Sequence, residues 1–140
     1  MRYKFLEHTA DIKFQAFGKT IEEAFENSVY ALNSVISKEK IKDALVTKIK
    51  VTGKDYESLL YNFLEEFLFL LDSENFVFNK INRMRDIKLN KNKEYELIAD
   101  VSGDSSKKYE FEQNVKAITY NEMFVKQEKG KWICQVVVDV

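Results

Sequence analysis

The sequence contains no proline, one cysteine and one histidine. The single cysteine, Cys134, excludes an internal disulfide and any zinc site built from clustered cysteines. The single histidine, His8, excludes two-histidine zinc sites and the motif H-E-x-x-H. The glycine-rich patterns G-x-x-x-x-G-K-S/T and G-x-G-x-x-G, which hold nucleotide phosphates, do not occur either. We therefore do not expect an enzyme that binds and uses a nucleotide by itself.

The chain has no excess of either charge and no long hydrophobic run. Its 22 lysines and arginines nearly balance its 23 aspartates and glutamates. This balance argues against nucleic-acid binding through total charge but leaves room for a local basic patch. The longest apolar stretch, residues 63–71, is broken by Glu65 and Glu66, whereas a membrane span needs about 20 apolar residues. Residues 1–8 have no apolar signal core, so we expect a soluble, cytoplasmic protein that does not bind membranes.

Length and composition predict a single domain over residues 1–140. A chain of 140 residues buries roughly two thirds of its unfolded surface, which is enough for a core without a disulfide or a metal. Its content of 45% hydrophobic and 32% charged residues is typical of a globular protein. Residues 79–94 are rich in lysine, arginine and asparagine, a pattern that predicts a solvated strand pair with a turn.

Two segments have the hydrophobic periodicity of amphipathic helices. The first, residues 20–37, repeats apolar side chains at i, i+3, i+4 and i+7. Thr20 and Glu23 fit a capping box there, in which each side chain accepts a hydrogen bond from a free main-chain N–H of the first turn. The second helix is predicted over residues 56–72, with Asp55 as its N-cap.

The second helix has the wider apolar face. Phe69 and Leu70 extend that face beyond the usual stripe, so we expect this helix to be the more buried of the two.

Segments that alternate between apolar and polar residues predict strands. They cover residues 2–6, 11–17, 46–52, 77–83, 86–89, 94–101, 115–125 and 131–140. Residues 126–130 fit a hairpin connection between the last two. These elements predict an α+β fold with antiparallel-rich β-sheets and two long α-helices packed against them.

Three places are more polar than the fold requires. The segment Glu7-His8-Thr9-Ala10-Asp11 fits a polar turn, or a cluster of oxygen ligands and a proton-transfer group. Asp139 next to the α-carboxylate of Val140 fits an exposed terminus, or, with a third acid, an all-oxygen site for Ca²⁺, Mg²⁺ or Mn²⁺ rather than zinc. Lys116, in an apolar strand, fits either a side chain that points into water or a functional group.

Taken together, these places resemble the archease family over nearly the full chain. Residues 5–12, read as Phe-Leu-Glu-His-Thr-Ala-Asp-Ile, are similar to its N-terminal signature. Residues 115–120, read as Val-Lys-Ala-Ile-Thr-Tyr, are similar to its internal signature. As in the family, the sequence ends with an aspartate and one aliphatic residue. Gly18 and the residues that open the first helix also fit the family pattern, as does the leucine-rich second helix.

The resemblance implies a protein cofactor and not an enzyme. Archeases assist the RtcB-type RNA ligase, which joins RNA 2′,3′-cyclic-phosphate or 3′-phosphate ends to 5′-hydroxyl ends in tRNA splicing and RNA repair. The ligase forms a histidine–GMP intermediate from GTP with manganese, and the archease promotes this guanylylation and multiple turnover. RNA, such as tRNA exon halves, would then be reached indirectly through the ligase.

The resemblance also implies the site residues. A divalent metal, with Ca²⁺ as the first expectation and Mg²⁺ or Mn²⁺ as alternatives, would be held by Asp11, Asp139 and Val140. The family's functional lysine corresponds to Lys116. We add His8 and Glu7 as neighbours that support this ligase-activation site. The sequence departs from the family pattern at Asn114, at Asn121 and at residues 103–105, where a proline-containing turn is usual. It also lacks the family's histidine just before the internal signature.

Two other functions are compatible with the same residues. One is a small metal-dependent hydrolase that uses Asp11 and Asp139, with His8 as general acid or base. The other is a chaperone-like binding module without chemistry, for which replacing Asp11 would affect only stability.

Overall fold

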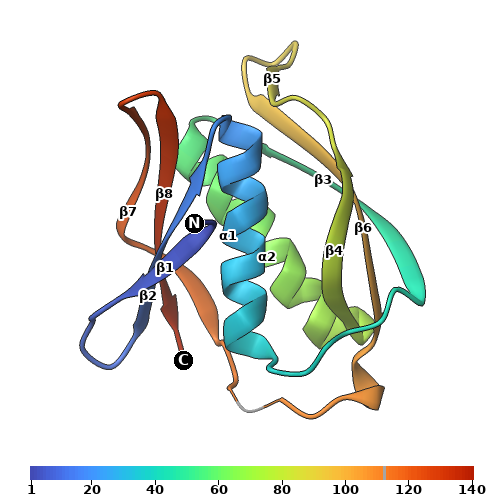
Figure 1. Ribbon diagram of the computed structural model, residues 1–140. Helices are drawn as coiled ribbons and strands as arrows, with labels where there is room; N and C mark the ends of the chain where they lie inside the picture. The colour runs from blue at the N-terminus through green and yellow to red at the C-terminus, as the bar shows by residue number, and fades with distance from the viewer. Residues whose placement is uncertain (112) are drawn as a thin grey trace.

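The computed structural model describes residues 1–111 and 113–140, and over these residues the protein has three layers (Figure 1). Two long helices lie in the middle, with one antiparallel sheet on each side. The elements are β1 (Tyr3–Leu6), β2 (Ile12–Gly18), α1 (Ile21–Ile36), β3 (Leu45–Gly53), α2 (Tyr56–Glu74), β4 (Phe76–Met84), β5 (Lys88–Leu89), β6 (Tyr95–Ser105), the short 3₁₀ helix η1 (Ser106–Lys108), β7 (Ala117–Glu128) and β8 (Lys131–Asp139).

The two sheets combine strands that are far apart in the sequence. The first, called sheet A, has the strand order β1-β2-β8-β7, so the second strand of the chain and the last one pair at its centre. The second, called sheet B, has the order β3-β6-β4, and the short β5 also pairs with β6. All these pairs are antiparallel. The predicted α+β fold with antiparallel sheets and two long helices is therefore confirmed.

Local side-chain hydrogen bonds fix where both helices begin. The Thr20 hydroxyl accepts from Glu23 N at 3.1 Å, as expected, but the Glu23 carboxylate accepts from Lys19 N and not from Thr20 N. Asp55 is the N-cap of α2, and its carboxylate accepts from Ser58 N at 2.7 Å. The Ser58 hydroxyl in turn accepts from Asp55 N at 3.2 Å, which completes a capping box that the sequence prediction did not include.

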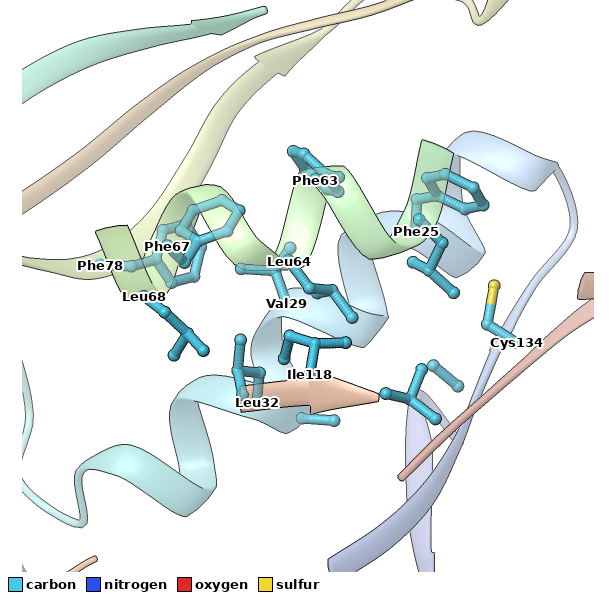
Figure 2. Packing of buried hydrophobic residues seen from close by; sticks show 14 of the residues in the cluster. Phe25, Val29, Leu32, Phe63, Leu64, Phe67, Leu68, Phe78, Ile118 and Cys134 are labelled. Carbon is cyan, nitrogen blue, oxygen red and sulfur yellow. The ribbon is translucent and has the colours of Figure 1, made fainter. Parts of the chain in front are cut away.

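The core is a layer of aromatic and aliphatic side chains between the sheets (Figure 2). Phe25 of α1 stacks on Phe63 of α2, with ring centroids 6.3 Å apart. Phe67 contacts both Phe63 and Phe78 of β4, at 5.2 and 5.1 Å, and so joins the helices to sheet B. Cys134 of β8 is fully buried and belongs to the part of the core that sheet A contributes. One continuous core thus holds both sheets and both helices together.

The expectation that α2 is the more buried helix is wrong. Ten residues of α1 are buried but only six of α2, and Phe69 is 52% exposed. The two helices differ in position. Helix α1 packs mainly on β2 and β8 at the centre of sheet A and also on β4, whereas α2 packs on β3, β4 and β6 of sheet B and on the edge strand β7 of sheet A. Phe69 and the last turn of α2 remain exposed. In the part of the chain that the structure describes, neither helix has the length and apolar character that crossing a membrane requires.

Two connections differ from the sequence prediction. The last hairpin turns over Lys129 and Gly130 alone, both with positive φ (51° and 78°). β7 therefore continues to Glu128, three residues further than expected, whereas β8 begins at Lys131 as predicted. The segment expected as a turn at residues 103–105 is instead the end of β6. Gly103 pairs there with Leu45 on one side and Phe78 on the other. A Cβ at this position would collide with the main chain of Val77, which explains the glycine.

Candidate functional site

The registers of sheet A bring the expected site residues to one end of the sheet. Ile12 of β2 pairs with Val138 of β8, and continuing this antiparallel register by one residue places Asp11 opposite Asp139. On the other side of β8, Lys116 N donates to the carbonyl oxygen of Asp139 at 2.8 Å. The end of β8, marked C in Figure 1, therefore lies between the loop before β2 and the segment before β7.

The side chains at this end differ in exposure. Asp139 and Val140 are half-buried, and Val140 packs against the core. The Asp11 side chain is 30% exposed. Lys116 and Glu7 are exposed. The partly buried acids are held by the fold, whereas the lysine and the outer glutamate are free to meet another molecule.

The His8 ring is held in a fixed orientation beside Asp11. Its Nε2 donates to Glu122 Oε2 at 2.8 Å, and its Nδ1 lies 4.0 Å from Asp11 Oδ2. Because a carboxylate only accepts hydrogen bonds, Nε2 must carry a proton. Among the described residues, Nδ1 is buried and has no hydrogen-bond partner. An unpaired buried nitrogen is costly, so this atom is available to a water, a proton or a ligand next to Asp11.

Glu122 is a site residue that the sequence prediction missed. It lies where the register of β7 shifts between Thr119 and Phe124, and its own φ is positive at 55°. The Glu122 carboxylate accepts from His8 and, at 3.2 Å, from Lys13 Nζ, and these two bonds hold the pKa of Glu122 below its ordinary value. No signal in the sequence near Glu122 points to His8, 114 residues away.

An open groove of about 430 Å³ runs beside this cluster. Its apolar wall comes from β1, the start of β2 and α1, and its polar edge from the loop before β2. The wall includes Phe5, which is 48% exposed, and the edge includes Glu7, His8 and Asp11. The groove is therefore accessible to a segment of another molecule that combines apolar and charged groups.

The donor set determines which metal could bind. Within residues 1–111 and 113–140, no group of three or more His, Cys, Asp or Glu side chains is arranged to hold a metal ion. The expected set has only two such side chains, Asp11 and Asp139, and its third ligand is the α-carboxylate of Val140. All three donors are carboxylate oxygens, which suit the hard cations Ca²⁺, Mg²⁺ and Mn²⁺. The residues present therefore fit a divalent hard cation.

Known sequences match this chain over nearly its full length. A family model described as the Archease protein family (MTH1598/TM1083) matches residues 3–140. The protein archease of Pyrococcus abyssi is 41% identical over 99% of both chains. The protein archease of Methanosarcina mazei is 39% identical over 99% of this chain and 96% of its own.

Solved structures share the fold. The solution structure of protein 1598 from Methanobacterium thermoautotrophicum superposes with a TM-score of 0.84 at 30% identity, covering 99% of both chains. A crystal structure from Thermotoga maritima, described as an archease and possible chaperone, superposes with a TM-score of 0.66 at 22% identity. It covers 98% of this chain and 96% of its own, and at this identity it speaks for the fold alone.

Proposed function

This chain belongs to the archease family, and we propose that it is an accessory protein of an RtcB-type RNA ligase. In this role it promotes guanylylation of the ligase and allows multiple turnover, in the cytoplasm, during tRNA splicing and RNA repair. It does not join RNA itself. The observation that carries the proposal is the convergence of Asp11, Asp139 and Lys116 at one end of sheet A.

The proposed metal ligands are Asp11, Asp139 and the α-carboxylate of Val140. Three carboxylates at one place repel each other, and a divalent cation relieves this repulsion. A cation held there supplies positive charge at the open end of sheet A. The oxygen-only donor set supports Ca²⁺, Mg²⁺ or Mn²⁺.

The metal proposal is tested by titration calorimetry of the protein freed of divalent ions. We expect saturable binding of Ca²⁺ or Mn²⁺ that is lost in Asp139→Asn and in a variant extended by a Gly-Ser segment after Val140. The extension removes the α-carboxylate from its place without altering a side chain. A matched N-terminal extension is the control. Unchanged binding in the C-terminally extended protein would remove Val140 from the ligand set.

Lys116 is proposed to act on the ligase directly. Its side chain is exposed, while its main-chain N–H donates to the carbonyl oxygen of Asp139. The backbone of Lys116 is therefore held in place, and its ammonium group extends into solvent. An ammonium group at this position can neutralise a phosphate of the ligase-bound nucleotide. Glu7 is exposed in the same loop as His8, whose Nδ1 lies 4.0 Å from Asp11 Oδ2. We propose that these two residues support the same contact.

The experiment that tests this role measures transfer of labelled GMP from GTP to the ligase. We expect the wild-type protein to accelerate the transfer and Lys116→Ala to lose most of the effect while remaining folded. Lys126→Ala is the matched control, since Lys126 is an exposed lysine on the same strand, β7, away from the site. A protein that accelerates transfer equally with or without Lys116 would contradict the assignment.

The two alternatives give different results in the same experiment. A metal-dependent hydrolase would cleave a substrate without the ligase and would leave guanylylation unchanged. A chaperone-like module, the class named for the Thermotoga maritima structure, would raise the amount of active ligase without dependence on Lys116 or Asp139.

A further inference from the structure

The outer face of sheet B carries a cluster of lysines and arginines that the ligase site does not use. We infer that this face binds the phosphate backbone of RNA. The cluster, called here the basic face, consists of exposed residues of β3, β4, β5 and the turn between β4 and β5. Its members are Lys48, Lys50, Lys80, Arg83, Arg85 and Lys88.

The strand registers place these cations in rows across the sheet. Lys48 of β3 and Arg83 of β4 both pair with Asp100 of the central strand β6. One row further, Lys50 pairs with Ile98, whose carbonyl oxygen accepts from Arg85 N at 3.0 Å. Successive rows on one face of a strand are roughly 7 Å apart. The basic face therefore presents two parallel lines of positive charge, with the carboxylates of Glu96 and Asp100 of β6 between them. Glu96 forms an ion pair with Lys50, and Asp43 forms one with Lys80, so the cations left for a polyanion are concentrated at Arg83, Arg85 and Lys88.

The arginine side of the basic face surrounds a hollow of about 360 Å³. Arg83, Arg85 and Lys88 line it together with Asp86 and Glu96. Over residues 1–111 and 113–140, none of these three cations lies within ion-pair distance of a carboxylate, whereas Glu96 is 3.8 Å from Lys50. Guanidinium groups without a carboxylate partner are suited to bind phosphate oxygens in a bidentate way.

Basic and acidic residues are concentrated in different elements of the molecule. Residues 79–93 contain six lysines and arginines and one aspartate, in a chain whose net charge is −1. The helices α1 and α2 together contain eight acidic residues and no lysine or arginine. A polyanion is therefore attracted to the edge of sheet B and repelled by the helical layer. The net charge of the whole chain does not reveal this uneven distribution, because the basic and acidic residues nearly cancel.

The composition of the face favours a nucleic acid over a protein partner. Lysine is depleted in protein–protein interfaces, which depend on buried aromatic and apolar anchors. The outward residues of β6 between these cations, Glu96, Ile98 and Asp100, include no aromatic side chain, and all six cations are exposed. Interfaces with nucleic acids are much more positively charged, and contacts to phosphates do not require a particular base sequence. The choice of RNA rather than DNA rests on the proposed function, since the positive charge of the face would attract either polyanion.

The position of the basic face would allow RNA and ligase to be bound together. Figure 1 shows the β5–β6 turn at the upper end of the molecule and the C-terminus at the lower end. The ligase site proposed above lies at that lower end, on the other sheet. RNA on sheet B would thus leave Lys116 and Asp139 free.

The test is a nuclear magnetic resonance titration of the labelled protein alone with a short stem-loop RNA. We expect the shifts to concentrate in residues 48–50 and 80–88, and a dissociation constant in the weak range of about 10⁻⁴ to 10⁻⁶ M. The triple variant Arg83→Gln, Arg85→Gln, Lys88→Gln should bind about tenfold more weakly at low salt. It should also lower the log–log salt slope by about three.

The matched control removes three positive charges from a different part of the surface. Lys4, Lys19 and Lys131 line a separate hollow beside β1 and β8, and the variant Lys4→Gln, Lys19→Gln, Lys131→Gln should keep wild-type affinity. Equal loss in both variants, or shifts centred on the Lys116 end, would overturn the inference. Equally strong binding of poly-glutamate to the same residues would overturn it in favour of an acidic protein partner. Since no ligase is present, the outcome is independent of ligase activation.

Discussion

At the scale of single residues, the candidate site depends on contacts that join distant parts of the chain. Asp11 and Asp139 were identified through a family resemblance and not from their spacing. Their proximity results from the pairing of β2 with β8. Glu122 had no such signal, because only the irregular register of β7 turns its carboxylate toward His8. Asp11 and Asp139 belong to motifs that can be read in the sequence, whereas the contact of Glu122 with His8 exists only in the folded chain.

The hydrogen bonds of Glu122 make stability depend on pH. His8 and Lys13 hold the pKa of Glu122 below its ordinary value of 4.5. The unfolded chain therefore binds more protons near that pH, and stability falls as the pH is lowered through the folded pKa. Glu122→Gln should lose less stability between neutral and acidic pH than the wild-type protein, as measured by urea unfolding. Identical pH dependence in the two proteins would show that the contact does not form in solution.

Cys134 should be chemically inert in the folded protein. Burial raises the pKa of its thiol to about 12, so almost none of the reactive thiolate is present at neutral pH. Iodoacetamide should label Cys134 in urea but not under native conditions, which mass spectrometry detects. Rapid labelling of the native protein would mean that the contact between β8 and the helices opens easily.

At the scale of elements, the sequence predicted what is determined locally. Both helices start at the expected caps because Thr20 and Asp55 bond to main-chain groups only three residues away. Strand positions followed from alternation for the same reason. The assignment of strands to two sheets could not be predicted, since β2 and β8 are separated by most of the chain. Nor could the exposure of Phe69, which depends on where α2 lies relative to β7.

Replacing phenylalanine with alanine should have a large effect on stability on the buried face of α2 and a small effect on its exposed face. Phe63 is fully buried between Phe25 and Phe67, and Phe63→Ala should lower the free energy of unfolding by about 3–5 kcal/mol. Phe69→Ala, on the same helix but 52% exposed, should change it by less than about 1 kcal/mol. Urea unfolding followed by circular dichroism measures both. Similar losses would mean that Phe69 is covered in solution.

The N-cap of α2 should contribute less to the free energy of unfolding than the buried Phe63 does. Asp55→Ala removes the acceptor for Ser58 N and should cost about 1 kcal/mol in the same unfolding experiment. Asp72→Ala, an exposed acid in the last turn of the helix, is the control and should be neutral or slightly stabilising, because an acid is unfavourable near a helix C-terminus. An equal effect of the two changes would contradict the capping role.

At the scale of the whole molecule, the three layers separate two surfaces. The C-terminal end of sheet A gathers the proposed metal ligands and Lys116 beside an open groove. The outer face of sheet B gathers exposed lysines and arginines; Lys80 and Lys50 are paired with Asp43 and Glu96, whereas Arg83, Arg85 and Lys88 have no carboxylate partner among the described residues. The acidic helices lie between the two sheets. A protein that assists a ligase needs a partner site and gains from a separate contact with the RNA, and these are the two roles that we propose for the two surfaces.

The most direct test of the account is RNA ligation by the RtcB-type ligase with RNA in large excess over enzyme. We expect the wild-type protein to convert a reaction that stops after about one turnover into one that continues. Lys116→Ala and Asp139→Ala should fail to do so although they remain folded, and the control Lys126→Ala should act like the wild type. If the wild-type protein leaves turnover unchanged, or if all three variants stimulate it equally, the proposed role of the Asp11, Asp139 and Lys116 site is wrong.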